Sequence, residues 1–247
     1  MDLLTKIKSK NFNVGIIGLG YVGLPLAYAF SNKDIKTLGF DINLKQTEML
    51  NDKKSYLKHI PDEKVSKMIS KGFIATTDFK KIEDVDVIII CVPTPLDHHK
   101  EPDLSAIIKT GHSIAPFIKK NQLIVLESST FPGTTDENLA NSLEKSNLEK
   151  NKDYYLAYSP EREDPGNKEY TTSTIPKIVG ADCDEAQELV YELYNQIIDN
   201  VVQVRSTRTA EAVKLTENIF RSVNIALVNE LKTIFDAMDI DIWEVIE

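Results

Sequence analysis

Short runs of β-branched and other apolar residues alternate along the chain with longer stretches in which apolar positions follow helical spacing. The short runs predict strands over residues 14–17, 36–40, 73–75, 85–92, 123–126, 154–157, 177–179 and 201–204. The longer stretches predict helices over residues 22–32, 44–51, 62–70, 104–117, 135–145 and 185–197. This alternation is typical of a doubly wound α/β fold, in which helices cover both faces of a parallel sheet.

The last part of the chain differs, because residues 207 to about 239 contain neither glycine nor proline and keep helical spacing throughout. They predict one helix of roughly 50 Å, at about 1.5 Å per residue. We expect residues 1–205 to form the sheet domain and residues 206–247 to form this long central helix and the start of the next. A helix of this length usually bridges domains or subunits. Residues 242–247 start an amphipathic pattern without a terminating cap, so we expect an N-terminal portion of a longer protein.

Charge and composition narrow the possible partners. The 247 residues include 29 Lys and Arg against 38 Asp and Glu, a net charge of −9, and no basic cluster. This balance argues against nucleic acid or anionic lipid as the main partner. The longest apolar run is far shorter than the ~18 residues of a membrane span, and the N-terminus has no leader pattern. With only two cysteines, the sequence indicates a cytoplasmic protein without a membrane partner.

A glycine-rich motif follows the first predicted strand and opens the first predicted helix. Gly18, Gly20 and Gly23 form a G-x-G-x-x-G pattern around Tyr21 and Val22. In this context the first glycine permits a tight turn, the second lets the backbone approach a diphosphate and the third lets the helix pack on the strand. The helix N-terminus then offers free N–H groups to the phosphates. The alternative to a diphosphate-binding turn is a glycine turn that only permits close packing. The predicted strand before the motif and the predicted helix after it argue against this alternative.

Asp41 lies at the end of the second predicted strand, where a carboxylate can accept hydrogen bonds from both hydroxyls of an adenosine ribose. The same carboxylate would repel a 2′-phosphate. The sequence therefore predicts a dinucleotide cofactor and favours NAD over NADP, although the nearby Lys45 weakens that preference slightly. With the glycine motif, Asp41 makes the predicted sheet domain Rossmann-type.

Three loops that follow predicted strands carry hydroxyl or charged side chains. Thr94 lies between two prolines after the fourth strand, Thr130 in a hydroxyl-rich loop after the fifth, and Arg162 in a charged loop after the sixth. Such residues are also common in ordinary turns. Because ligands of open parallel sheets bind beyond the carboxyl ends of the strands, three such loops at one edge favour a shared site.

On the predicted long helix, Lys214, Asn218 and Arg221 are spaced by four and three residues and share one face. A solvated helix face is the ordinary interpretation of such a group. If that face closes over the dinucleotide cleft, Lys214 is a candidate for stabilising an alkoxide or relaying a proton, and Arg221 for binding a substrate phosphate or hydroxyl.

The cysteines and histidines indicate neither a nucleophile nor a metal site. Cys91 ends an apolar strand, and Cys183 has acidic neighbours, which raise a thiol pKa. The four histidines show no spacing with Cys or Asp that is typical of zinc ligands.

Five motifs carry a resemblance to a known family. They are Gly-Leu-Gly-Tyr-Val-Gly-Leu-Pro at 18–25, Val-Pro-Thr-Pro at 92–95, Glu-Ser-Ser-Thr at 127–130, Ser-Pro-Glu-Arg at 159–162 and Glu-Ala-Val-Lys-Leu-Thr-Glu-Asn at 211–218. In this order they resemble the nucleotide-sugar 6-dehydrogenases. The family oxidises a sugar C6 alcohol to a carboxylate in two hydride transfers to NAD, through a thioester on a cysteine. It comprises an NAD domain, a long dimerisation helix and a C-terminal UDP-binding domain, so the resemblance implies a homodimer through the long helix.

The resemblance implies roles for particular residues. It implies that NAD contacts Tyr21, Val22, Asp41, Thr94 and Thr130, beside the glycines of the turn. It also implies that Thr130 and Glu161 position the catalytic water. Lys214 and Asn218 would steady the oxyanion and, with Arg162, Glu163 and Arg221, contact the sugar nucleotide.

Two departures from the family pattern qualify the resemblance. The loop at 160–166 has the sequence Pro-Glu-Arg-Glu-Asp-Pro-Gly, which is similar to that of the UDP-N-acetylglucosamine or UDP-N-acetylmannosamine branch. The second glutamate of this loop in the UDP-glucose branch therefore has no clear counterpart here. The Gly-Gly-His-Cys motif that bears the nucleophile is expected after Glu247, so these residues are expected to bind NAD without completing the four-electron oxidation.

Two other functions fit parts of the pattern. β-Hydroxyacid dehydrogenases share the Gly-Leu-Gly turn and place a lysine on a helix after the sheet domain, but the Val-Pro-Thr-Pro and Ser-Pro-Glu-Arg loops favour the first interpretation. A non-catalytic NAD-binding or dimerisation module is the third, and the missing cysteine motif is its best support.

Overall fold

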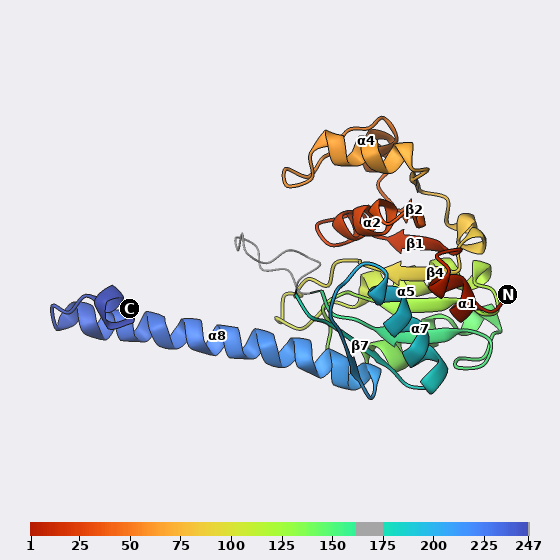
Figure 1. Ribbon diagram of the computed structural model, residues 1–247. Coiled ribbons are helices and arrows are strands. Elements are labelled where there is room, and N and C mark those ends of the chain that lie inside the picture. Colours follow the sequence, from red (N-terminus) through yellow and green to blue (C-terminus); the bar gives the residue numbers. More distant parts are fainter. Residues whose placement is uncertain (162–174, 247) are drawn as a thin grey trace.

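The computed structural model describes residues 1–161 and 175–246, which form a sheet domain and one protruding helix (Figure 1). The sheet has eight strands in the order β3-β2-β1-β4-β5-β6-β7-β8. Their bounds are β1 Asn13–Ile17, β2 Lys36–Phe40, β3 Ile74–Thr76, β4 Val87–Ile90, β5 Leu123–Leu126, β6 Tyr155–Tyr158, β7 Lys177–Ala181 and β8 Val201–Val204. The strand order reverses between β1 and β4, which run parallel. In such a fold the carboxyl ends of the strands at this point are the expected ligand site.

Helices lie on both faces of the sheet. They are α1 Leu3–Lys8, α2 Gly23–Asn32, α3 Leu44–Asn51, α4 Asp62–Ser70, α5 Ser105–Ile114, α6 Ala140–Ser142, α7 Asp184–Asn195, α8 Thr207–Ala237 and α9 Ile242–Ile246. Short 3-10 turns cover Phe79–Asp84, Ala115–Phe117 and Glu144–Ser146, and a π-helical turn covers Thr134–Leu139. Helices α1, α2, α3, α4 and α7 bury side chains against one face, and α5 and the start of α8 against the other.

Strand β4 shows why the doubly wound prediction is right. Val87 and Ile89 belong to the core on one face, while Ile88 and Ile90 belong to the core on the other, and all four side chains are fully buried. The sequence of a strand that is covered on both faces is a continuous apolar run, without alternating apolar and polar residues.

The end of the sheet differs from the prediction of parallel strands. Strand β7 pairs antiparallel with β6, with Ala157 opposite Ala181 and Tyr158 opposite Gly180, and β8 runs parallel to β7. Parallel neighbours need a crossover connection that is usually helical, and the sequence between β6 and β7 has no helical pattern. An antiparallel pair needs no such crossover, which explains the reversal.

Local chemistry accounts for the other differences from the predicted elements. The helix expected over residues 104–117 ends at Ile114 and continues as a 3-10 turn that contains Pro116. The helix expected over residues 135–145 is instead a π-helical turn followed by the short α6 and a 3-10 turn. Helix α1 is not in the prediction; Asp2 caps it by accepting a hydrogen bond from the Thr5 N–H at 2.8 Å.

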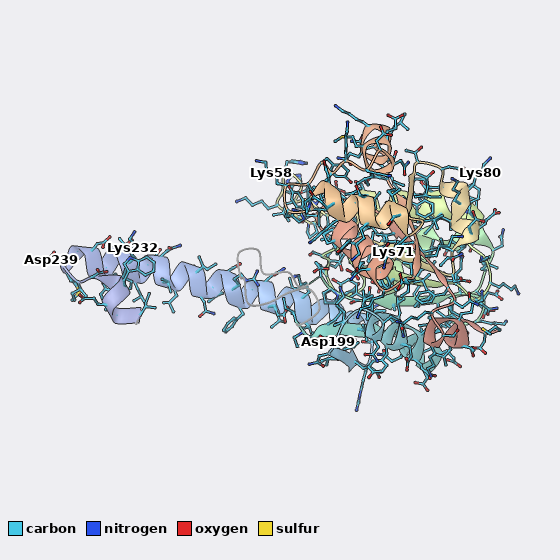
Figure 2. All side chains as sticks on the ribbon, turned by 45° about the horizontal axis from the view of Figure 1, so that its top comes forward. Lys58, Lys71, Lys80, Asp199, Lys232 and Asp239 are labelled. Atoms are coloured by element: carbon cyan, nitrogen blue, oxygen red, sulfur yellow. The ribbon has the colours of Figure 1, made fainter. Side chains whose placement is uncertain are left out.

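The predicted long helix is present as α8, with 31 residues and a length of about 47 Å. Ser206 caps its N-terminus by accepting a hydrogen bond from the Thr209 N–H at 3.1 Å. Among the described residues, the first turns of α8 contact the sheet domain, and the remainder extends away from it, as Figure 2 shows out to Lys232 and Asp239.

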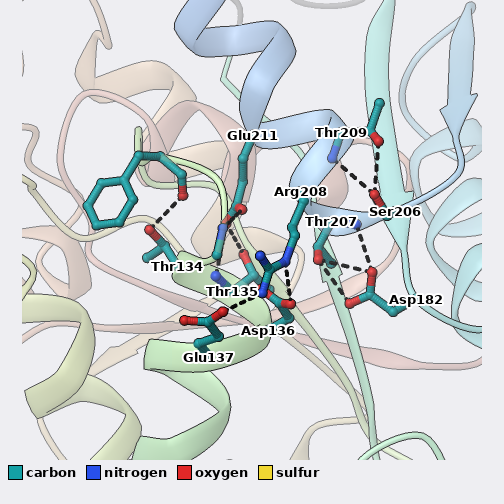
Figure 3. Close-up of polar contacts among 12 residues, drawn as sticks. Thr134, Thr135, Asp136, Glu137, Asp182, Ser206, Thr207, Arg208, Thr209 and Glu211 are labelled. Atoms are coloured by element: carbon teal, nitrogen blue, oxygen red, sulfur yellow. Dashed lines mark hydrogen bonds and ion pairs between the residues drawn. The ribbon is translucent and has the colours of Figure 1, made fainter.

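One buried carboxylate attaches the start of α8 to the sheet domain (Figure 3). Glu211 is fully buried and accepts hydrogen bonds from the Gly133 N–H at 2.8 Å, the Thr135 N–H at 2.9 Å and the Thr135 hydroxyl at 2.7 Å. Nearby, the Arg208 guanidinium pairs with Asp136 at 2.8 Å. These contacts fix α8 against the loop that follows β5.

Replacing Glu211 with alanine would leave the buried N–H groups of Gly133 and Thr135 without their acceptor. We expect Glu211→Ala to lower the free energy of unfolding by roughly 2–4 kcal/mol, measured by urea denaturation. Glu230→Ala changes an exposed glutamate farther along the same helix and should shift it by less than about 0.5 kcal/mol. Equal losses in the two variants would contradict the role assigned to Glu211.

Candidate functional site

The turn between β1 and α2 is compact because two of its glycines have no room for a side chain. Gly18 adopts a φ of 89°, and a Cβ at this position would lie 2.6 Å from the Cys91 carbonyl oxygen. A Cβ on Gly23 would lie 1.9 Å from the Gly18 carbonyl oxygen. The N-terminus of α2 is thereby held against the end of β1, with its first N–H groups at the sheet edge.

Asp41 ties this turn to the end of β2. One carboxylate oxygen accepts a hydrogen bond from the Leu19 N–H at 2.9 Å, and the other accepts from the Asn43 N–H at 2.9 Å. An ionised carboxylate has about four acceptor sites, so it can still accept hydrogen bonds from two ribose hydroxyls. This position matches the geometry that the sequence predicts for an adenosine ribose.

Two adjoining cavities lie at this edge of the sheet and share Gly18, Asp41, Ile42, Val92 and Pro93. The first, about 650 Å³, is on the side of α5 and also includes Phe79, Ala106 and Lys109. The second, about 590 Å³, is on the side of α2. Its further lining residues include Gly20, Tyr21, Val22, Thr94, Glu127, Ser129 and Glu161. Two cavities joined beside a glycine turn suit an extended dinucleotide with its diphosphate in the middle.

The loops after β4 and β5 meet beside the second cavity. The Thr94 hydroxyl donates a hydrogen bond to the Ser129 carbonyl at 2.6 Å, and the Ser128 hydroxyl donates one to the Val92 carbonyl at 2.7 Å. Thr130 follows and is 9% exposed. The structure thus brings Thr94 and Thr130 onto two loops that are hydrogen-bonded to each other.

Helix α8 brings Lys214 to the loop after β6. Its ammonium donates a hydrogen bond to the Glu161 carbonyl oxygen at 2.5 Å. Asn218 and Arg221 lie farther along α8, are exposed, and are not among the residues that line the two cavities. In the described part of the chain, Asn218 and Arg221 therefore do not reach the cleft. Arg162 and Glu163 lie outside the described residues.

A buried charged cluster beneath the second cavity is absent from the sequence-based prediction. Glu127, which is fully buried, accepts a hydrogen bond from the Tyr194 hydroxyl and faces the Lys177 ammonium at 3.0 Å. The same ammonium lies 3.5 Å from the Glu161 carboxylate. Burial raises the pKa of Glu127 to about 7, although Lys177 acts in the opposite direction. An apolar strand just before Glu127 was the available signal that this residue is buried.

The two cysteine thiols are poor nucleophiles. Burial raises the pKa of Cys91 well above its ordinary value, and burial also raises the pKa of Cys183. Within residues 1–161 and 175–246, three or more His, Cys, Asp or Glu side chains nowhere converge in a metal-binding group. In the same ranges, every helix is too short or too polar to cross a bilayer.

Comparison with known proteins agrees with this geometry. Residues 12–198 match the model of the UDP-glucose/GDP-mannose dehydrogenase family, NAD binding domain, and residues 208–247 match the central domain of that family. A UDP-N-acetyl-D-glucosamine 6-dehydrogenase from Pseudomonas aeruginosa is 39% identical over 94% of this chain and 55% of its own length. The chain therefore spans about half the length of that relative.

Solved structures give the same result. A UDP-D-ManNAc dehydrogenase from Pyrococcus horikoshii superposes with a TM-score of 0.88 at 30% identity, over 94% of this chain and 56% of its own. A 3-hydroxyisobutyrate dehydrogenase from Mycobacterium tuberculosis, at 13% identity and a TM-score of 0.67 over 93% of this chain and 67% of its own, shares the fold alone. The chain belongs to the UDP-glucose/GDP-mannose dehydrogenase family and carries its NAD-binding domain.

Proposed function

We propose that this chain is the NAD-binding half of an enzyme that oxidises the C6 hydroxyl of a UDP-N-acetylhexosamine to a carboxylate, for the synthesis of polysaccharide precursors. The observation that carries the proposal is the meeting of Lys214 with Glu161 beside the cleft that opens at the glycine turn. The names of the relatives from Pseudomonas aeruginosa and Pyrococcus horikoshii support the N-acetylhexosamine substrate.

Different residues along the cleft would bind different parts of the cofactor. Asp41 would hold the adenosine ribose, and the N–H groups around Gly20 would hold the diphosphate. NAD supplies the hydride acceptor. The whole oxidation converts the alcohol, one water and two NAD⁺ into the carboxylate, two NADH and three protons, so the site must also stabilise oxyanions and position water.

Lys214 and Glu161 fit those two tasks. The Lys214 ammonium would stabilise the negative charge that develops on the C6 oxygen as its proton leaves, with Asn218 assisting from the next turn of α8. The Glu161 carboxylate, together with Thr130, would orient the attacking water. Arg162, Glu163 and Arg221 are proposed to contact the sugar nucleotide.

The nucleophilic thiol and the UDP-binding domain are proposed to lie outside these residues. The printed sequence has no Gly-Gly-His-Cys motif, and the pKa values of both of its thiols are raised. In this division of roles, residues 1–205 bind NAD and residues 206–247 link that domain to the rest of the enzyme.

We infer that two copies associate along α8. Leu215, Ile219, Val223 and Leu227 repeat every four residues and are 40%, 54%, 60% and 54% exposed. Side chains at this spacing form a row along one side of a helix, and exposed apolar rows of this length mark interaction surfaces. Lys214 and Asn218 lie on a different face, so dimer contacts along the row leave the cleft open.

A second candidate function is a non-catalytic module that binds NAD and dimerises. The raised pKa values of Cys91 and Cys183 favour it, because neither thiol is a good nucleophile. Such a module would bind NAD and would contribute nothing to the oxidation of any sugar nucleotide.

An activity measurement separates the two candidates. We expect this chain alone to bind NAD⁺ without releasing two NADH per UDP-N-acetylhexosamine. Fused to the C-terminal half of the Pseudomonas aeruginosa relative, it should release two NADH per sugar from UDP-N-acetylglucosamine or UDP-N-acetylmannosamine and much less from UDP-glucose. In that fusion, Lys214→Met should lower kcat at least about a hundredfold while NAD⁺ affinity stays unchanged.

The fusion must bind NAD⁺ and give the circular dichroism of a folded protein for this comparison to count. A folded, NAD⁺-binding fusion that oxidises none of the sugar nucleotides would favour the non-catalytic module. Two NADH per sugar from these 247 residues alone would contradict the proposed division of roles.

The second glycine of the turn gives a prediction about cofactor binding. A Cβ at Gly20 would meet no atom within 4 Å, so alanine fits the folded chain. The added methyl group would occupy the side from which a diphosphate approaches. We expect Gly20→Ala to keep the urea midpoint and to weaken NAD⁺ binding at least about tenfold in calorimetry. Unchanged affinity would place the diphosphate elsewhere.

The apolar row on α8 gives a prediction about assembly. Val223→Glu puts a charge in the middle of the row, and we expect it to convert the dimer into a monomer in sedimentation velocity experiments. Asn229→Glu adds the same charge on a different face of the helix and should leave the dimer intact. A monomeric wild-type chain, or a dimeric Val223→Glu variant, would contradict dimerisation through this row.

A further inference from the structure

Two carboxylates share one ammonium in the buried cluster beneath the second cavity. Glu127 follows β5, Lys177 begins β7, and Glu161 follows β6. The Lys177 ammonium lies 3.0 Å from the Glu127 carboxylate and 3.5 Å from that of Glu161. It also lies 5.0 Å from the centre of the Tyr194 ring, and the Tyr194 hydroxyl donates to Glu127. With both carboxylates ionised, the cluster carries one net negative charge.

Among the described residues, the thiol and the two phenols beside this cluster stay neutral near pH 7, while the Lys214 ammonium on α8 donates a hydrogen bond to the Glu161 carbonyl oxygen. Burial raises the pKa of the Cys91 thiol and of the Tyr194 hydroxyl well above their ordinary values, and it also raises the pKa of Tyr158. Lys177 stays charged: burial opposes its charge, but the two carboxylates outweigh burial and raise its pKa. A change in the charge of the cluster near neutral pH is therefore a change in its carboxylates.

Glu127 is the carboxylate that takes up a proton in this range. Burial raises its pKa to about 7; Lys177 acts against this shift, and the charge of Glu161 adds to it. Near neutral pH the cluster can therefore exchange a proton, and it carries its negative charge only in the ionised form.

The cluster lies toward one end of the cleft. Glu127 and Glu161 line the same cavity as Gly20, whereas the first cavity, on the other side of Asp41, includes neither glutamate. With the adenosine ribose at Asp41 and the diphosphate at Gly20, the nicotinamide extends toward Glu127 and Glu161. The oxidised nicotinamide ring carries a positive charge and the reduced ring carries none.

We propose that Glu127, with Lys177 and Glu161, forms a proton-binding site under the nicotinamide that makes the cleft favour NAD⁺ over NADH. Binding of the cationic ring expels the proton from Glu127 to solvent, and the neutral ring of NADH leaves it in place. The inference rests on the proposed function only for the position of the nicotinamide in the cleft.

The direction of the pH dependence follows from linkage. Because the cation stabilises the ionised carboxylate, bound NAD⁺ lowers the pKa of Glu127, and NAD⁺ affinity must rise as pH increases through that range. If the pKa falls by one unit, NAD⁺ binds about tenfold more tightly above the transition than below it, and its binding releases a fraction of a proton at a pH within the transition. NADH affinity should stay nearly constant over the same range.

Isothermal titration calorimetry of the full chain tests this inference directly. Titrations at pH 7 in two buffers of different ionisation enthalpy give the number of protons released by NAD⁺ and by NADH. We expect release with NAD⁺ and almost none with NADH. Glu127→Gln should abolish release with NAD⁺. Glu188→Gln, which changes an exposed carboxylate paired with Lys8, should retain it.

Three outcomes would overturn the inference. Equal proton release with NAD⁺ and NADH, or full release in a folded Glu127→Gln variant, would assign the proton to another group. NAD⁺ binding without proton release would overturn this inference and leave the proposed function in place. A wild-type chain that binds no NAD⁺ would overturn both.

A second measurement covers a Glu127→Gln variant that fails to fold. Infrared spectroscopy of the wild-type chain detects a protonated buried carboxyl group by its C=O stretch. We expect this band to disappear as the pH is raised through the region near 7. At a pH within this transition, NAD⁺ should decrease the band and NADH should leave it unchanged. Absence of such a band at pH 6 would overturn the inference.

Discussion

The packing of the turn between β1 and α2 is the constraint on which the rest of the site depends. Gly23 must approach the Gly18 carbonyl and Gly18 must approach the Cys91 carbonyl, so neither position accepts a side chain. This packing holds the start of α2 at the edge of the sheet, beside the carboxyl ends of β1 and β4. Asp41 accepts its hydrogen bond from Leu19 within the same turn. The turn thus presents backbone N–H groups to the cleft, which suits a ligand recognised through its phosphates.

Helix α8 adds chemistry to that cleft through a short buried connection. Glu211 fixes the helix to the loop after β5, and Lys214, three residues later, meets the loop after β6. The rest of the helix carries the exposed apolar row through which we propose that two copies associate. The same element thus brings a cation suited to stabilising an oxyanion to the cleft and carries this proposed dimer surface.

The sequence predicts the parts of the molecule that local pattern determines. The buried run of β4, the glycine turn and the uninterrupted pattern of α8 each have a direct local signature. The antiparallel direction of β7 has no such signature in the strand itself. The pair of Glu127 and Lys177 joins residues far apart in the chain, and a charged residue beside a strand reads as exposed until the fold supplies its partner. The sequence therefore predicts a cleft at this edge and Glu161 beside it, but not the buried pair of Glu127 and Lys177.

From those charges and the glycine turn we infer that the cofactor lies along the cleft with its nicotinamide over the buried cluster. A crystal structure of the chain with NAD⁺ tests this description most directly. We expect the diphosphate at the N–H groups around Gly20, the adenosine ribose on Asp41 and the nicotinamide beside Glu127 and Glu161. A cofactor bound in the reverse direction, or a cleft left empty at saturating NAD⁺, would contradict it.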